Sequence, residues 1–121
     1  LHSTAWGKVL VAFDPAARAD LDESEPVGFT ARTVTDPVAL DAECVTVRER
    51  GWASDIEESV LGLAGIAAPI RDRRGNPLGA VGISGAVERI VRDGAPRPTL
   101  VAAVRDAARA VSRDLGASYP Y

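Results

Sequence analysis

Two apolar runs separated by a polar turn constrain the fold of this chain more than any other feature of its sequence. The runs cover residues 65–70 and 78–84, and residues 71–77 between them read RDRRGNP. Gly75 and Asn76 tolerate the positive φ angles that tight turns require, so the pattern predicts a β-hairpin. We therefore expect an antiparallel sheet at the centre of the structure.

The two faces of this hairpin differ, because successive side chains of a strand point to opposite sides of the sheet. One face carries the bulkier residues, which suit packing under helices: Ile66, Ala68, Ile70, Val81 and Ile83. The other face is lined mainly by small residues: Gly65, Ala67, Pro69, Leu78, Ala80, Gly82 and Ser84. Glycine weakens a strand, so Gly65 and Gly82 on one face indicate a close approach. Either a bound ligand or a tightly packed helix accounts for it.

Helical patterns flank the hairpin on both sides. We expect helices over residues 1–13, 15–21, 36–51 and 98–116, and a short strand over 52–55. Ser3 or Thr4 can cap the first helix, because either hydroxyl can accept a bond from a free backbone N–H. Asp36 before Pro37 is typical of a helix start. Gly51 and Gly116 suit the ends of the third and last helices.

Apolar spacing predicts which side of each helix is buried. For the first helix two sets of positions are possible: Ala5, Val9 and Ala12, or Trp6, Val9, Leu10 and Phe13. The third helix has Leu40, Cys44 and Val47 in line. The last helix carries a longer stripe: Val101, Val104, Ala108, Val111 and Leu115. We therefore expect Cys44 to be buried and unreactive, since free cysteine in a core behaves as a small apolar side chain.

Composition excludes several classes of protein. The length of 121 residues suits one domain, and a net charge of −3 argues against direct nucleic-acid binding by this chain. No apolar run approaches the roughly 20 residues that cross a membrane. Cys44 is the only cysteine, so a disulfide is excluded, and a reducing, cytoplasmic compartment is the simpler expectation. The chain begins at Leu1 rather than Met, so we expect it to be part of a longer protein.

Residues for catalysis are scarce. His2 is the only histidine, and no histidine follows Ser84, so a Ser-His-acid arrangement is not expected. One histidine and one cysteine also make a metal site improbable, and we expect no metal and no cofactor. Asp55, Glu57 and Glu58 form an acidic cluster. It is either a solvated loop or a set of polar contacts in a pocket.

The start of the first helix favours binding of an anion. The first N–H groups of a helix have no partner within the helix and lie at its positive end, where a carboxylate is stabilised. Gly7 has no side chain to block the approach. This signal is weak alone, because every helix has such an end.

Four segments together resemble the IclR-type (isocitrate lyase regulator) transcription factors. Residues 1–10, LHSTAWGKVL, resemble the signature LHATAxGKALLA, and residues 47–58, VRERGWASDIEE, are similar to VRxRGYAxDxEE. Residues 62–70, GLAGIAAPI, are similar to GLxCIAAPV, and residues 83–85, ISG, to the end of SISGP. The segments occur in the order and at the spacing of that family.

The resemblance implies that residues 1–121 are the C-terminal part of an effector-binding domain. Its fold would be α+β and GAF-like, with a curved, mostly antiparallel sheet flanked by helices. The first strands of that domain and the DNA-binding winged helix-turn-helix would lie outside this chain. The implied function is sensing of a small organic acid in a homo-oligomer, a dimer or tetramer, that contacts DNA only through the absent domain. No membrane contact is implied, and with its first strands outside the chain we expect an uncovered sheet edge that favours self-association.

The same resemblance places the ligand on the concave face of the sheet. The implied contacts come from Ala5, Trp6, Gly7, Asp55, Gly65, Gly82 and Ser84. Backbone N–H groups of Ala5 and Trp6 would hold the carboxylate. Gly65 and Gly82 stand where the family has Cys and Ser, so we expect room for a larger, apolar or aromatic acid that contacts Trp6.

Two other functions stay open at this point. A domain that only oligomerises, and has lost ligand binding, would be favoured if Trp6 or its neighbours filled the concave face. A small enzyme on the same fold would need an activated nucleophile, which the sequence does not show.

Overall fold

A three-stranded antiparallel sheet in the order β1-β2-β3 forms the centre of the fold. The computed structural model describes residues 2–23 and 26–115. The strands are β1 (Ala53–Ile56), β2 (Leu63–Arg71) and β3 (Pro77–Ala86). The predicted hairpin is therefore confirmed as β2 and β3, and Gly75 in its turn has a φ of 83°. The α+β fold class is confirmed with it.

Four longer helices surround the sheet, close to the predicted ranges. They are α1 (Ala5–Phe13), α2 (Pro15–Glu23), α3 (Pro37–Arg50) and α5 (Pro98–Asp114). Thr4, rather than Ser3, caps α1, since its hydroxyl accepts a bond from the Gly7 N–H at 3.1 Å. Three short elements were not predicted: α4 (Val87–Ile90), β4 (Val91–Arg92) and β5 (Ala95–Pro96). Too few residues lie in each for a periodic pattern to show.

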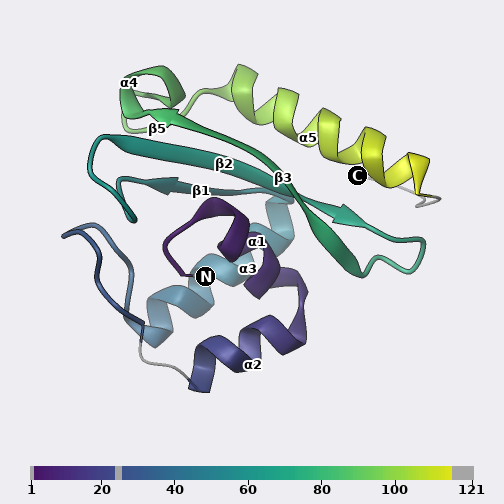
Figure 1. The fold of residues 1–121 in the computed structure, drawn as a ribbon, viewed down its shortest axis with the longest axis horizontal. Coiled ribbons are helices and arrows are strands. Elements are labelled where there is room, and N and C mark those ends of the chain that lie inside the picture. Colours follow the sequence, from purple (N-terminus) through teal and green to yellow (C-terminus); the bar gives the residue numbers. More distant parts are fainter. Residues whose placement is uncertain (1, 24–25, 116–121) are drawn as a thin grey trace.

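The helices cover the two faces of the sheet unequally. Figure 1 shows α5 along one face, and α1, α2 and α3 on the other. On the α5 side the fully buried Ile66 packs with Val104 and Ala108, so the bulky face lies under a helix as expected. Full burial of a side chain of this size contributes about 1.5–3 kcal/mol to folding.

The small-residue face lies under α1. Ala5, Val9 and Ala12 of α1 are buried, with Ala53 and Ala67 of the sheet in the same cluster. This is the first of the two predicted sets of buried positions, while Trp6 and Phe13 are only partly buried. Close packing of a helix thus accounts for much of the small-residue face.

The predicted buried stripe of the last helix is wrong at its C-terminal end. Val111 is 38% exposed and Leu115 is 54% exposed, whereas Ser112 is completely buried. The Ser112 hydroxyl donates to the Ala108 carbonyl at 2.8 Å and accepts from the Arg71 N–H at 3.0 Å. The end of β2 needs a polar partner there, and α5 turns a serine toward it. Gly116, the expected end of this helix, lies outside the described residues.

None of the helices in the described part of the chain is long and apolar enough to cross a membrane. Cys44 on α3 is buried, as predicted. Burial raises the pKa of its thiol, which lowers the fraction of reactive thiolate.

We expect Cys44 to react slowly with a bulky thiol reagent in the folded protein, roughly 100-fold more slowly than after unfolding, because reaction requires local opening. Absorbance assays with a chromogenic disulfide reagent measure both rates. The double variant Cys44→Ala, Val45→Cys is the matched control, since Val45 is the exposed neighbour on the same helix. Equal rates for the two folded proteins would contradict the prediction.

Candidate functional site

The residues of the predicted site lie together beneath the first turn of α1. The strand register pairs Asp55 with Gly65 and Gly65 with Ser84, which places the three in one row across the sheet. Residues paired in this way face the same side. The Ala5 N–H at the start of α1 donates to the Asp55 Oδ1 at 3.2 Å, so this row meets the helix directly.

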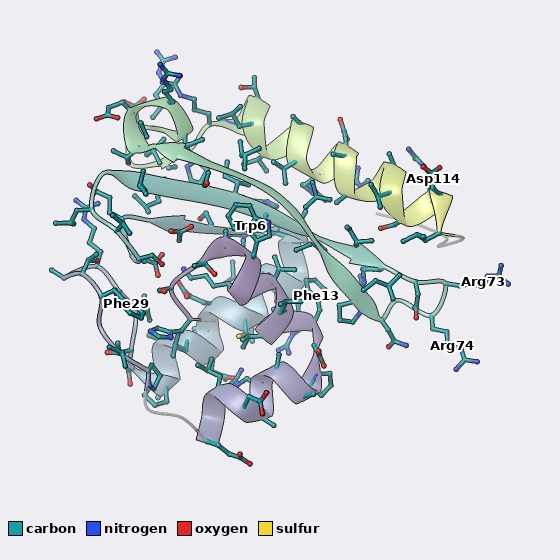
Figure 2. The ribbon with its side chains drawn as sticks, viewed as in Figure 1. Trp6, Phe13, Phe29, Arg73, Arg74 and Asp114 are labelled. Atoms are coloured by element: carbon teal, nitrogen blue, oxygen red, sulfur yellow. The ribbon has the colours of Figure 1, made fainter. Side chains whose placement is uncertain are left out.

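The indole of Trp6 occupies the space above both glycines (Figure 2). A Cβ atom added to Gly82 would lie 2.6 Å from Cε2 and from Cζ2 of Trp6. A Cβ added to Gly65 would lie 2.7 Å from the Asp55 Oδ1 and 3.4 Å from Cζ3 of Trp6. The room expected for a larger ligand is therefore taken by the indole of Trp6 itself.

Two polar groups at this turn have no partner in the described part of the chain. The Ala5 N–H binds Asp55, the Gly7 N–H binds the Thr4 hydroxyl, and the Lys8 N–H binds the Thr4 carbonyl. The Trp6 N–H has no such bond to any described residue. Ser84 is exposed, and its hydroxyl likewise forms no hydrogen bond with the described residues. Within the described part of the chain, the Trp6 N–H on α1 and the Ser84 hydroxyl on β3 are thus without a hydrogen-bond partner.

The carboxyl group of Asp55 is buried. It is 7% exposed, and burial raises its pKa, which the Ala5 N–H and the Lys8 charge lower less strongly. The folded protein therefore holds a proton on Asp55 more readily than an unfolded chain would.

A buried ion pair beside this site was missed by the sequence analysis. Lys8 is 6% exposed, and its ammonium donates to Glu58 at 2.7 Å, to the Ser54 carbonyl at 2.9 Å and to Glu43 at 3.3 Å. All three of its donors are thereby used. The position of Lys8 in the sequence could have indicated its burial, since Lys8 lies one turn from Ala5 and from Ala12 on the buried side of α1.

The three residues of the acidic cluster have different environments, so each of the two expectations, a solvated loop or buried polar contacts, holds for part of it. Asp55 and Glu58 are buried and make polar contacts, while Glu57 pairs with Arg32 at 3.1 Å on the surface. Burial raises the pKa of Glu58, against the lowering effect of Lys8.

Catalytic groups do not assemble in the described residues. The ring of His2 bonds the Val27 carbonyl at 2.6 Å and stacks on Phe29, so it is engaged away from the sheet. Within residues 2–23 and 26–115, no three His, Cys, Asp or Glu side chains gather as a metal site would require.

Sequence comparison matches this chain to a family of transcriptional regulators. The family model described as "Bacterial transcriptional regulator IclR C-terminal" matches residues 1–113. The glycerol operon regulatory protein of Streptomyces coelicolor is 59% identical over 117 residues, which are 97% of this chain and 46% of that protein. This chain thus spans about half the length of the relatives that it matches.

Solved structures show the same fold. The Thermotoga maritima IclR structure has a TM-score of 0.79 and 32% identity, and the match covers 95% of this chain and 47% of that one. The C-terminal domain of the Escherichia coli regulator KdgR has a TM-score of 0.78 and 34% identity, covering 95% and 70% of the two chains.

We expect Gly82→Ala to lower the free energy of unfolding by about 1–3 kcal/mol, because the new methyl group displaces Trp6 or the Ile66 carbonyl. Gly79→Ala on the same strand is the matched control, since no atom lies within 4 Å of its added Cβ. Urea unfolding of both variants measures the difference. Equal stability of the two would show that the indole does not press on the sheet at Gly82.

We expect Asp55→Asn to become more stable relative to the wild type as the pH rises from acid to neutral. The raised pKa of Asp55 means that wild-type stability falls as pH rises through the folded-state value, and asparagine has no such loss. Asp72→Asn should change in the opposite direction, since hydrogen bonds from Asn76 lower the pKa of Asp72. Denaturant unfolding over a pH series tests both, and a difference that does not vary with pH would refute the interpretation.

Proposed function

Because this chain belongs to the IclR C-terminal family of bacterial transcriptional regulators, we propose that it senses a small organic acid and passes the signal to a DNA-binding domain elsewhere in the protein. The protein would act in the cytoplasm as a homo-oligomer, a dimer or tetramer. The family relation supports an effector-binding role. The proposed chemical class of the effector is inferred from the residues of the candidate site.

The contact between the Ala5 N–H and the Asp55 carboxylate carries this proposal. It shows that the first turn of α1 already accommodates a carboxylate oxygen at its N–H groups. The carboxylate of an effector would take the place of Asp55 and also accept a bond from the Trp6 N–H. Asp55, once displaced and protonated or turned toward a ligand hydroxyl, would not repel the acid.

Trp6 and Ser84 would set the size and polarity of the effector. The indole fills the space over Gly65 and Gly82, so a compact acid suits the site better than the larger aromatic acid expected from the sequence. The exposed Ser84 hydroxyl lies in the same row as Asp55 and can bond a polar group of the ligand. The Streptomyces coelicolor relative is named for a glycerol operon, which makes three-carbon hydroxy acids the first compounds to test.

The effector would act by shifting a conformational equilibrium. It would bind the state in which Asp55 has left Ala5 and would not bind the closed state. A ligand shifts such an equilibrium only by its difference in affinity for the two states. The output on DNA then depends on which state the rest of the protein favours.

A second candidate function is oligomerisation without ligand binding. Trp6 over the glycines favours it, because the concave face is filled and the Ala5 N–H is satisfied within the chain. The relatives are named as transcriptional regulators, which favours a regulatory role for this chain over catalysis.

We expect a small organic acid at 100 times its dissociation constant to stabilise the protein by about 2.7 kcal/mol. Ser84→Ala should cost about 0.5–3 kcal/mol of binding, the range for one hydrogen bond to a neutral or charged group. Thr99→Ala, on the exposed side of α5, should leave binding unchanged. Thermal unfolding with a series of acids measures all three.

Trp6→Ala separates the two functions. For a sensor, wild-type protein responds to a compact acid, and Trp6→Ala extends the response to larger acids. If no acid stabilises the wild type while Trp6→Ala binds acids, the face has been closed and oligomerisation is the remaining role. If neither protein binds any acid, the effector site on this face is wrong.

A further inference from the structure

A cleft of about 770 Å³ lies at the other end of α1 from the candidate site. The ends of α1, α3 and β2 meet there with the start of α2 and the middle of α5. We call it the arginine cleft. Its lining includes five arginines and two carboxylates: Arg18, Arg48, Arg50, Arg71, Arg105, Asp14 and Glu49. So many guanidinium groups in one cleft are notable in a chain whose net charge is −3.

Two of the guanidinium groups are held in place by aromatic rings. Arg50 lies 3.6 Å from the ring centroid of Trp52, and its Nε donates to the Trp52 carbonyl at 2.8 Å. Arg71 lies 4.7 Å from the ring centroid of Phe13, and its Nε donates to the Gly75 carbonyl at 2.8 Å. Each side chain is thus restrained by a cation–π contact and by a hydrogen bond from its Nε, which lowers the conformational entropy that would be lost when a ligand binds.

Three of the arginines have no carboxylate partner. Arg48, Arg50 and Arg105 form no ion pair with any residue that the structure describes, whereas Arg18 pairs with Asp41 at 2.9 Å. Partial burial lowers the pKa of Arg50, and the negative charge of Glu43 offsets part of that effect. The C-terminal ends of α1 and α3 each favour a nearby cation by about 0.3–1 kcal/mol.

We infer that the arginine cleft binds a compact oxyanion with two or more negative charges, a phosphate group or a polycarboxylate. The planar fork of a guanidinium matches two oxygens of either group at once. The cleft volume lies within the range of small-molecule sites, roughly 300–1,000 Å³. This inference does not depend on the proposed function, because the two sites share no residue.

The test measures binding of inorganic phosphate and of citrate to the purified protein by calorimetry, with sodium chloride holding the ionic strength constant. Acetate is the singly charged comparison. We expect saturable binding of phosphate, citrate or both, and about tenfold weaker binding for Arg48→Gln/Arg105→Gln, since bonds to charged groups are lost. The matched control is Arg109→Gln/Arg113→Gln, which removes the same charge from α5 outside the cleft.

Each outcome decides the inference. Binding that is lost in the cleft variant and kept in the control supports it, and the preferred probe distinguishes phosphate from polycarboxylate. Equal weakening in the two variants indicates general charge attraction and overturns it. So does an acetate affinity equal to those of the other two probes, or no saturable binding. If circular dichroism shows that the double variant is unfolded, Arg105→Gln alone is compared with Arg109→Gln. Ser84→Ala separates the two sites, because binding that this variant weakens belongs to the candidate effector site, whereas binding that it keeps and the cleft variant loses belongs to the arginine cleft.

Discussion

The close contact between α1 and the small-residue face of the sheet is the constraint on which the rest of the molecule depends. Val9 and Ala67 are buried in that contact, and α1 in turn connects the sheet to α2 and α3. Larger side chains on the sheet would push α1 outward. The first turn of α1 would then lose its bond to Asp55, and Lys8 would lose the carboxylates that it reaches. The same contact therefore sets both the core and the geometry of the candidate site.

The position of Trp6 explains why residues 65 and 82 are glycines. Gly65 and Gly82 look at first like lost ligand contacts, but an indole lies where their side chains would be. Alanine at position 82 would already meet Trp6, so the large and small residues are mutually required. The chemistry at its rim, the N–H groups of α1 and the Ser84 hydroxyl, stays in place.

Periodicity was sufficient to predict most of the fold. The hairpin, α1, α3 and the buried position of Cys44 all follow from spacing, caps and turn residues, because these depend on near neighbours in the chain. The resemblance brought Asp55, Gly65 and Ser84 to one site, and the strand register places them in one row. The sequence left the filling of that site by Trp6 open as one of two alternatives, since a rotamer choice depends on packing across elements. Ser112 shows the same limit, because it is buried only to meet a backbone N–H of another element.

The burial of Lys8 also determines which reagents can modify the surface of the protein. It is the only lysine of the chain, its ammonium is enclosed by two carboxylates, and all other side-chain cations except the single histidine are arginines. The surface of the described residues therefore presents no primary amine on a side chain. Acylating reagents, amine-directed cross-linkers and lysine acetylases would find nothing to modify there while the domain stays folded. Its positive surface charge would persist into strongly alkaline solution, because guanidinium groups hold their protons where amines have lost theirs.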